Sequence, residues 1–416
     1  MSLRGSFQPP GDKSISHRIA LLALLARGEC RVENFSPCAD CAASLAALRG
    51  LGGGVEEEGE ALAIRGAGGK LVPEAEMDCG NSGTTMRLLC GVLAGVEGEY
   101  TLDGDESLRR RPMARVARPL RLMGAQVKTR DGRPPLAVRG GGLQGIDYHL
   151  PVASAQLKSA LLLAGLQAEG ETVIHEPAPS RDHSERLLRL MGADLQGGEG
   201  VWRVRRSRLV LPGSFRVPGD ASSAAFFLCA AAILPGSRLS AGGVLLNPTR
   251  TGFLSVLERM GARLEVQRQG EQPEPWGRVT VEHGPELTAC RVAAEEIPLL
   301  VDEVPILALV ATQARGTTVF EGVGELRVKE SDRVAALLSQ LGALGARLTV
   351  RGEDLLVHGP TVLAAPAELE SFGDHRIAMT LRLACLLAGG ESRIRGEECT
   401  AISYPGFHRQ LEELLS

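Results

Sequence analysis

A short motif that occurs twice is the feature that most restricts how this chain can fold. The stretch Pro10–Ser14 reads PGDKS, and Pro218–Ser222 repeats it near the middle of the chain as PGDAS. Each copy leads into an alanine-rich apolar run, as expected of a chain built from duplicated structural units. Lys13 in the first copy is replaced by Ala221 in the second. We therefore expect the two units to share a scaffold but not a chemistry.

Weaker copies of this opening indicate more repeats. They begin near residues 80, 151, 298 and 373, so six units of roughly 70 residues would cover the 416-residue chain. Most units also contain a Leu-Gly or Met-Gly pair between a helical and an extended pattern, where glycine suits the left-handed backbone at a helix end. The similar placement of five pairs makes coincidence the poorer explanation. They are Leu51–Gly52, Met123–Gly124, Met191–Gly192, Met260–Gly261 and Leu344–Gly345.

Each unit shows the same succession of hydrophobic patterns. Residues 224–233 are apolar on nearly every side, which is typical of a helix buried inside a layered domain. Residues 317–321 alternate as a strand does, and residues 332–341 form a second, more polar helical pattern. The sequence therefore predicts an α/β (α+β) fold of repeated β-α-β-α-β modules, with one helix of each module inside.

The strong echo between the first and fourth units favours two lobes of three units over a single ring. Gly11 and Gly219 then lie where the chain crosses between lobes. This division predicts one lobe at 12–218 and a second at 1–11 with 219–416. At each crossing a short loop leads into a helix, whose N-terminus presents unpaired N–H groups and a positive dipole. Several such helix ends around a common cleft would attract anions.

Composition narrows the location and the partners. The chain has 44% hydrophobic and 23% charged residues, a net charge of −4, and no apolar run long enough to cross a bilayer. Its N-terminus lacks a secretion signal, so we expect a cytoplasmic protein with no membrane partner. Only 3% of residues are aromatic and there is no continuous basic helix, which argues against nucleic acid as a partner.

The nine cysteines are scattered and lack histidines at metal-ligand spacing. We expect most of them to be buried free thiols. Cys38 and Cys41 form one isolated pair, for which structural packing is favoured over a zinc or redox role. The sequence predicts no metal site.

Basic and hydroxyl side chains recur at the openings of the units. Any one of them alone could be a solvated surface charge. Their recurrence at corresponding places favours a binding site for small, multiply charged metabolites. The residues are Lys13, Ser14, Arg18, Asn81, Gly83, Thr84, Arg87, Ser154, Gln156, Lys158, His375 and Arg376, together with Arg109–Arg111 and Lys329–Arg333.

Two carboxylates stand out among these cations. Asp302 lies within an apolar stretch, whereas Glu330 is flanked by Lys329 and Arg333. An apolar environment disfavours the charged form of a carboxylate and neighbouring cations favour it, so the two could differ in protonation as a proton-transferring pair requires. A purely structural alternative stays open for each: a helix N-cap before Pro305 for Asp302 or Glu303, and an intrahelical ion pair for Glu330.

Seven short motifs, in order along essentially the whole chain, resemble the signature set of the 5-enolpyruvylshikimate-3-phosphate (EPSP) synthase family. The wording of the first and sixth motifs is closer to the bacterial class II branch than to class I. The motifs are GDKSISHR at 11–18, GNSGTTMR at 80–87, RPM at 111–113, SAQ at 154–156, DEVP at 302–305, LRVKESDR at 326–333 and GDHRIAM at 373–379.

The resemblance implies a two-lobed enolpyruvyl-transferase fold, with three βαβαββ units per lobe and the active site in the interlobe cleft. It implies transfer of the enolpyruvyl group of phosphoenolpyruvate to the 5-hydroxyl of shikimate 3-phosphate, with release of phosphate through a tetrahedral intermediate. Such an enzyme of the shikimate pathway is a glyphosate target and acts without a metal or an organic cofactor.

The resemblance also implies roles for individual residues. Asp302 would take the proton of the 5-hydroxyl, while Glu330, with Lys13 nearby, would handle the proton at C3 of phosphoenolpyruvate. The residues expected around phosphoenolpyruvate are Lys13, Gly83, Thr84, Arg111, Gln156, Arg333 and Arg376. Those expected around shikimate 3-phosphate are Ser14, Arg18, Ser154, Gln156, Ser180, Asp302 and Lys329, and Asn81, Ala155 and His375 complete the candidate substrate-binding set.

The chain departs from the class I pattern at two positions. Ile402 stands where class I enzymes place a phosphate-binding lysine, and Ala155 replaces a serine that binds the substrate phosphate. One cation and one hydroxyl are therefore missing or supplied from elsewhere. Gly83 is kept, although some glyphosate-tolerant class II members carry alanine there, so the sequence leaves tolerance open.

Two other functions are weighed against this one. A sister enzyme that transfers the same group to a UDP-amino sugar would be expected to show a Lys-Asn pair in the first motif and a catalytic cysteine. Here Ser14 follows Lys13, and the loop from Arg109 to Met113 has no cysteine. An RNA-end-processing cyclase or a non-catalytic repeat scaffold could share the repeats, but neither explains the two carboxylates among so many cations. A monomer is expected.

Overall fold

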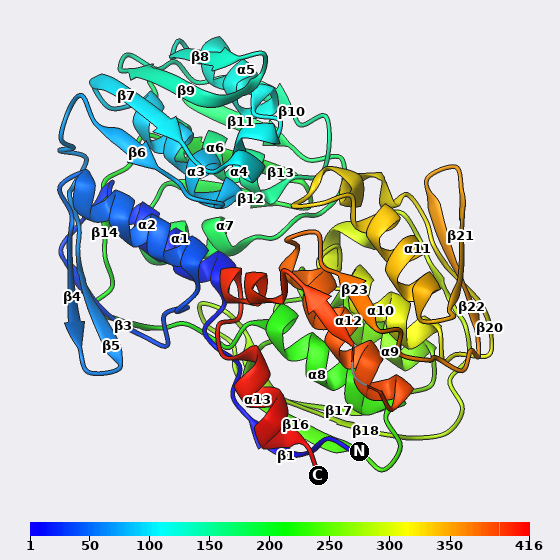
Figure 1. Ribbon diagram of the computed structural model, residues 1–416. Coiled ribbons are helices and arrows are strands. Elements are labelled where there is room, and N and C mark those ends of the chain that lie inside the picture. The colour runs from blue at the N-terminus through cyan, green and yellow to red at the C-terminus, as the bar shows by residue number, and fades with distance from the viewer. Residues whose placement is uncertain (391) are drawn as a thin grey trace. The chain divides into compact units, whose positions relative to one another are not determined.

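The protein consists of two compact units (Figure 1). The structure, a computed structural model, describes residues 1–390 and 392–416. Unit 1 comprises Met1–Pro10 and Pro218–Ser416, and unit 2 comprises Gly11–Val217. The lobe boundaries expected from the sequence lie within one residue of these limits.

Unit 2 contains three repeats of one strand arrangement. In each four-stranded sheet one parallel pair of strands is extended by an antiparallel hairpin. The strand orders are β15 (Ser214–Arg216), β3 (Glu29–Glu33), β5 (Ala61–Arg65), β4 (Gly54–Glu58); β6 (Glu76–Asp78), β7 (Gly98–Asp103), β9 (Arg133–Gly140), β8 (Gln126–Arg130); and β10 (Asp147–His149), β11 (Glu171–His175), β13 (Val201–Arg205), β12 (Leu195–Gly198). A further short pair joins β2 (Ala26–Arg27) and β14 (Leu209–Val210).

One helix of each repeat in unit 2 is buried in its interior. These helices are α1 (Lys13–Leu22), α3 (Gly83–Ala94) and α6 (Ala155–Gly165), and α3 packs against both of the others. Their residues are apolar on most sides because they are enclosed by neighbouring helices and strands. The remaining helices are α2 (Ala39–Gly50), α4 (Glu106–Arg110), α5 (Ala114–Leu122) and α7 (His183–Leu190).

Unit 1 repeats the same strand arrangement twice over its described residues. β1, from the N-terminal segment, pairs in parallel with the second strand of the first sheet. The strand orders are β1 (Arg4–Phe7), β16 (Arg238–Leu245), β18 (Trp276–Glu282), β17 (Arg263–Gly270); and β19 (Arg291–Val292), β20 (Gly316–Phe320), β22 (Asp354–Gly359), β21 (Arg347–Arg351). The strand expected at 317–321 is therefore β20.

The sixth repeat is shorter than the expected six-element unit. Over its described residues the sheet has two parallel strands, β23 (Glu368–Glu370) and β24 (Arg393–Arg395). A 3₁₀ helix (Glu397–Ile402) and α13 (Phe407–Leu414) follow, in place of a hairpin. The chain then returns to the N-terminal segment, where the backbones of Ser2 and Ser416 exchange two hydrogen bonds.

Three mutually packed helices form the interior of unit 1: α8 (Ala221–Ile233), α10 (Val304–Ala311) and α12 (His375–Ala388). Figure 1 shows them grouped together within the unit. Every residue of α8 and α10 is buried, which confirms the fully apolar helix expected at 224–233. The other helical segments are α9 (Gly252–Arg259), α11 (Arg333–Ala343), and the 3₁₀ helices Ile297–Leu299 and Val323–Val328.

The five glycines of the Leu-Gly and Met-Gly pairs all have left-handed backbones. Their φ angles range from +85° to +106°, and each follows the last residue of a helix and its cap. A side chain would strain the backbone there, so the prediction of glycine helix ends is confirmed.

The nine cysteines all lie in the described part of the chain and are all free thiols. Seven are buried, and Cys290 and Cys399 are half-buried, which confirms the expectation of mostly buried thiols. No helix formed by residues 1–390 and 392–416 is both long enough and apolar enough to cross a bilayer.

Candidate active-site residues

The interior helices of unit 2 begin at the predicted binding motifs. In each case the preceding residue caps the helix, because its side chain accepts a hydrogen bond from the backbone N–H three positions later. The helices open with Lys13, Gly83 and Ala155, and the caps are Asp12, Ser82 and Ser154. Ser154 is thereby used as a cap, which the sequence prediction of a substrate contact did not anticipate. The first turns carry the positive ends of three helix dipoles.

Side chains from α3 and α6 bring two of these first turns together. Arg87 Nη1 donates a hydrogen bond to Gln156 Oε1, and Gln156 Nε2 donates to Thr84 Oγ1 at 2.8 Å. Arg87 is 8% exposed. Gln156 and Thr84, both expected beside phosphoenolpyruvate, are therefore neighbours. Arg87, which closes the motif that contains Thr84, was expected from the sequence only as a member of the anion site and was not assigned to either substrate.

Gly83 lies between two guanidinium groups. A methyl group added to it would lie 3.1 Å from Arg87 Nη1 and 3.2 Å from Arg111 Nη1. Arg111 Nη2 also donates to Asn81 Oδ1 at 2.8 Å. The predicted residues Asn81, Gly83 and Arg111 thus form one cluster, and its two arginines can bind carboxylate or phosphate oxygens in pairs.

Arg18 is almost fully buried and is engaged by the protein itself. Its Nε donates to Ser184 Oγ at 2.7 Å, its Nη2 to Ser159 Oγ at 3.0 Å, and its Nη1 to the carbonyl oxygen of Ser14 at 2.9 Å. These bonds join α1, α6 and α7. Arg181 Nη1 reaches Ser14 Oγ at 3.4 Å. Direct contact of Arg18 and Ser14 with a substrate stays a prediction.

Lys13 forms an ion pair with Asp40 of α2. One turn further along α1 lies the buried His17, whose Nδ1 is hydrogen-bonded to Ser44 Oγ at 2.8 Å. Burial, and to a lesser extent the charges of Lys13 and Arg18, lowers the pKa of His17 well below its ordinary value. The sequence offered no signal for Asp40, because it lies far from Lys13 in the chain.

Lys158, expected in the anion site, is completely buried and is paired with two carboxylates of the protein. Its Nζ lies 2.8 Å from Glu176 Oε2 and 2.6 Å from Glu185 Oε1. Trp202 Nε1 donates to the same Glu176 oxygen at 3.1 Å. The hydroxyl of Ser180, predicted to bind substrate, donates to Glu176 Oε1. An internal ion cluster thus holds the side chain of Ser180.

Unit 1 contains a second cluster, centred on the buried Arg333. Its Nη1 lies 3.2 Å from Asp302 Oδ1, its Nη2 2.7 Å from Glu330 Oε2, and its Nε 2.8 Å from Asp374 Oδ2. Arg376 Nε lies 3.5 Å from the same Asp302 oxygen. Burial opposes the charge of Arg333, but the three carboxylates outweigh burial and raise its pKa. Both predicted proton-transfer residues therefore share one fixed cation.

The structure corrects the environment expected for Asp302 and confirms a cation beside Glu330. Asp302 is surrounded by charge, not by an apolar wall, because its side chain is directed toward Arg333 and Arg376. The N-cap position of α10 is occupied by Glu303, one of the two residues expected there, and its side chain makes no capping hydrogen bond. The Glu330–Arg333 ion pair forms, but α11 begins at Arg333, so the pair is not intrahelical.

The other predicted residues of unit 1 lie at or next to the ends of helices. Asp374 caps α12 by accepting from the backbone N–H of Arg376 at 2.9 Å, and the buried His375 opens that helix. Lys329 is half-buried just before α11. Burial lowers the pKa of Lys329, and the charge of Asp302 opposes that shift. Ile402, at the class I lysine position, ends a 3₁₀ helix in the same unit.

Comparison with known proteins decides the family. The family described as EPSP synthase (3-phosphoshikimate 1-carboxyvinyltransferase) matches residues 1–411. The chain belongs to the EPSP synthase family. The predicted family is thereby confirmed.

Relatives in the EPSP synthase family match over the full length. The chain is 47% identical to the 3-phosphoshikimate 1-carboxyvinyltransferase of Bacillus velezensis, across 99% of this chain and 97% of that protein. It is 49% identical to the enzyme of the same name from Synechococcus sp. strain JA-3-3Ab, across 100% of this chain and 95% of that protein.

Solved structures confirm the predicted fold class. An EPSP synthase structure from Acinetobacter baumannii matches with a TM-score of 0.87 and 40% identity, over 99% of this chain and 96% of that one. The enolpyruvyl transferase NikO from Streptomyces tendae matches with a TM-score of 0.81 and 21% identity, over 99% of this chain and 95% of that one. The latter likeness concerns the fold alone. The chain therefore has the two-lobed enolpyruvyl-transferase fold.

Proposed function

We propose that this protein transfers the enolpyruvyl group of phosphoenolpyruvate to the 5-hydroxyl of shikimate 3-phosphate and releases phosphate. The single observation that carries the proposal is the cluster in which Asp302 and Glu330 share Arg333, with Arg376 beside it. The family match and the full-length relatives of the same name support this reaction. It is a step of the shikimate pathway toward aromatic amino acids.

The binding of two anionic substrates follows from the arginines and helix ends. Arg111 and the neighbouring Arg87 would bind oxygens of phosphoenolpyruvate over Gly83, where the absence of a side chain leaves room for a close approach. Arg333 and Arg376 would bind the same substrate from unit 1. The predicted contacts of Ser154, Ser180 and Lys329 with shikimate 3-phosphate belong to this proposal.

The two carboxylates would move the protons. As the 5-hydroxyl oxygen attacks C2 of phosphoenolpyruvate, Asp302 takes the hydroxyl proton. Glu330, with Lys13 as the alternative, delivers a proton to C3, which gives a tetrahedral ketal phosphate. The phosphate then leaves with the C–O bonding electrons while a proton is removed from C3, so the enolpyruvyl double bond forms again. Arg333 supports both steps because it fixes the positions of both carboxylates.

Several finer assignments belong to the same proposal. The motif wording supports the class II branch. A monomer, as expected from the sequence, belongs to the same proposal. The acidic net charge argues against nucleic acid as a partner. The metabolic role proposed for the protein favours a location in the cytoplasm.

The test is phosphate release from phosphoenolpyruvate with each of two acceptors. Release that depends on shikimate 3-phosphate, with an enolpyruvyl product identified by mass spectrometry, is the expected result. Release only with UDP-N-acetylglucosamine would replace this function by that of the sister enzyme. Release with neither acceptor would favour the cyclase or scaffold alternative. A Glu330→Gln variant is the matched control for contaminating phosphatase.

A further inference from the structure

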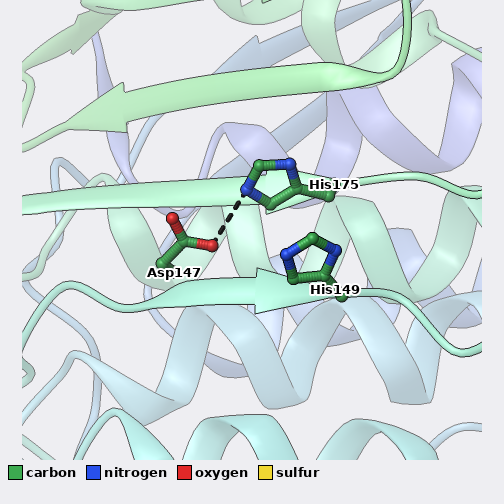
Figure 2. A group of neighbouring side chains, drawn as sticks. All are labelled: Asp147, His149 and His175. Atoms are coloured by element: carbon green, nitrogen blue, oxygen red, sulfur yellow. Dashed lines mark ion pairs between the residues drawn. The ribbon is translucent and has the colours of Figure 1, made fainter.

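A group of three metal-ligand side chains lies on one sheet of unit 2, outside the residues assigned to the reaction (Figure 2). β10 and β11 run parallel, and their register places His149 directly beside His175. The two imidazole rings are stacked, with centroids 4.1 Å apart and an interplanar angle of 5°. Asp147, two residues before His149 on the same face of β10, has Oδ1 2.9 Å from His175 Nε2.

The donor atoms match a particular class of ion. One ligand atom of each of the three side chains lies within 4.8 Å of the other two. Two imidazole nitrogens and one carboxylate oxygen are a common ligand set for zinc and neighbouring divalent transition metals. Magnesium and calcium instead select oxygen ligands. Three protein ligands would leave a fourth position for water.

The backbone beneath this group is held by strand pairing, while the side chains can be reached from solvent. β11 is paired on both sides, with β10 and with β13. Asp147 and His149 are exposed and His175 is half-buried, so an ion can enter and the stacked rings have room to turn their nitrogens toward it. The ligand positions are thus preorganised by the sheet, although the side chains still adjust.

The neighbouring charges on this face do not account for the group. Glu171 of β11 already pairs with Arg203 and Arg205 of β13, at 3.2 Å and 3.0 Å. The Asp147–His175 pair is mostly exposed, and exposed ion pairs contribute little to stability.

We propose that Asp147, His149 and His175 form a binding site for one divalent transition-metal ion of the zinc type. This site is separate from the transfer reaction, since none of its three ligands is assigned to the substrates or to proton transfer. The sequence predicted no metal, because the register of β10 and β11 brings together ligands that are 26 residues apart along the chain.

The probe is Zn²⁺ added to metal-free full-length protein at neutral pH, followed by isothermal titration calorimetry. One saturable equivalent of Zn²⁺ is expected. Loss of an outer-shell partner of a metal site typically weakens metal binding by about tenfold or more, so removal of a ligand in His149→Ala or His175→Ala should weaken it by at least about tenfold. Asp147→Asn should also weaken Zn²⁺ binding, by no more than the histidine variants do. Co²⁺ should give visible absorption bands that the same variants lose.

His358→Ala is the matched control, because His358 is a half-buried strand histidine whose ring nitrogens face Thr317 and Thr349. It should bind Zn²⁺ as the unmodified protein does. Circular dichroism and phosphate release without added metal should be unchanged in the site variants, which separates lost metal binding from misfolding. The proposal is overturned if no saturable equivalent is seen, if the site variants bind normally, or if Cys290→Ser with Cys399→Ser abolishes binding instead.

Discussion

Removal of the buried ammonium group of Lys158 should destabilise unit 2 strongly. The side chains of Lys158 and Glu185 are 0% exposed and that of Glu176 is 2% exposed, so Lys158→Met would leave two buried carboxylates without their shared cation. Breaking a buried ion pair on one side costs about 3–5 kcal/mol. Glu176 would keep the hydrogen bonds from Ser180 and Trp202, so most of the cost should arise at Glu185.

The cost should depend on pH. Burial raises the pKa of Glu185, and the nearby Lys158 opposes that shift. Without Lys158 the pKa of Glu185 should rise further, so the carboxyl would take up a proton more readily in the folded state. The destabilisation by Lys158→Met should therefore be smaller in mild acid than at neutral pH, because the folded state then binds more protons than the unfolded state.

Tryptophan fluorescence can isolate the unfolding of unit 2. The chain has two tryptophans, Trp202 in unit 2 and Trp276 in unit 1. In a Trp276→Phe background the signal comes from Trp202, whose ring centroid lies 5.5 Å from the Lys158 ammonium. For a unit of this size a loss of 3–5 kcal/mol lowers Tm by about 6–20 °C.

Two comparison variants make the result decisive. Lys128→Met removes an exposed lysine from β8 of the same unit and should change the free energy of unfolding by no more than about 0.5 kcal/mol. Lys158→Met combined with Glu185→Gln should recover much of the loss, since no unpaired buried charge remains at that position. The reasoning is refuted if Lys158→Met and Lys128→Met unfold alike, or if the double variant is no more stable than the single one.

Three further predictions concern proton binding and substrates. Burial and neighbouring cations hold the pKa of His17 well below 6.5, so the unfolded state gains a proton first as pH falls below about 6.5, and the free energy of unfolding should decline there. In urea titrations at several pH values, His17→Gln should flatten this decline. An equal dependence on pH in the two proteins would contradict the burial argument. Asp302→Asn and Glu330→Gln should each lower turnover by about 10²- to 10⁴-fold with a smaller effect on substrate affinity, and steady-state kinetics showing normal turnover would remove that residue from the mechanism. Arg111→Ala should weaken phosphoenolpyruvate binding by about ten- to a hundredfold, and calorimetry that finds normal affinity would argue against its placement.

Local features of the chain were predictable because they depend on neighbours in sequence. The PGD motif was expected to open a buried helix at both of its occurrences, and Asp12 and Asp220 do cap α1 and α8 in the same way. Helix capping and the left-handed glycines depend on a few consecutive residues, so a single sequence contains the required information. The seven motifs likewise identified the family, which the full-length match confirmed.

Charge environments required the tertiary structure. Asp302 lies in an apolar stretch of the sequence, yet it contacts Arg333 and Arg376, which lie at the starts of α11 and α12. Lys158 was expected to contribute to an anion site, yet its ammonium group is paired with Glu176 and Glu185.

The amino-acid order alone therefore determined the repeats, the helix ends and the family, because each is encoded by residues close together in the chain. The tertiary structure decided which charges meet, and it brought His149 beside His175 through the pairing of two strands. The physical reason is that electrostatic and metal-ligand interactions act over a few ångströms in space, irrespective of separation along the chain, and only the folded backbone sets those distances.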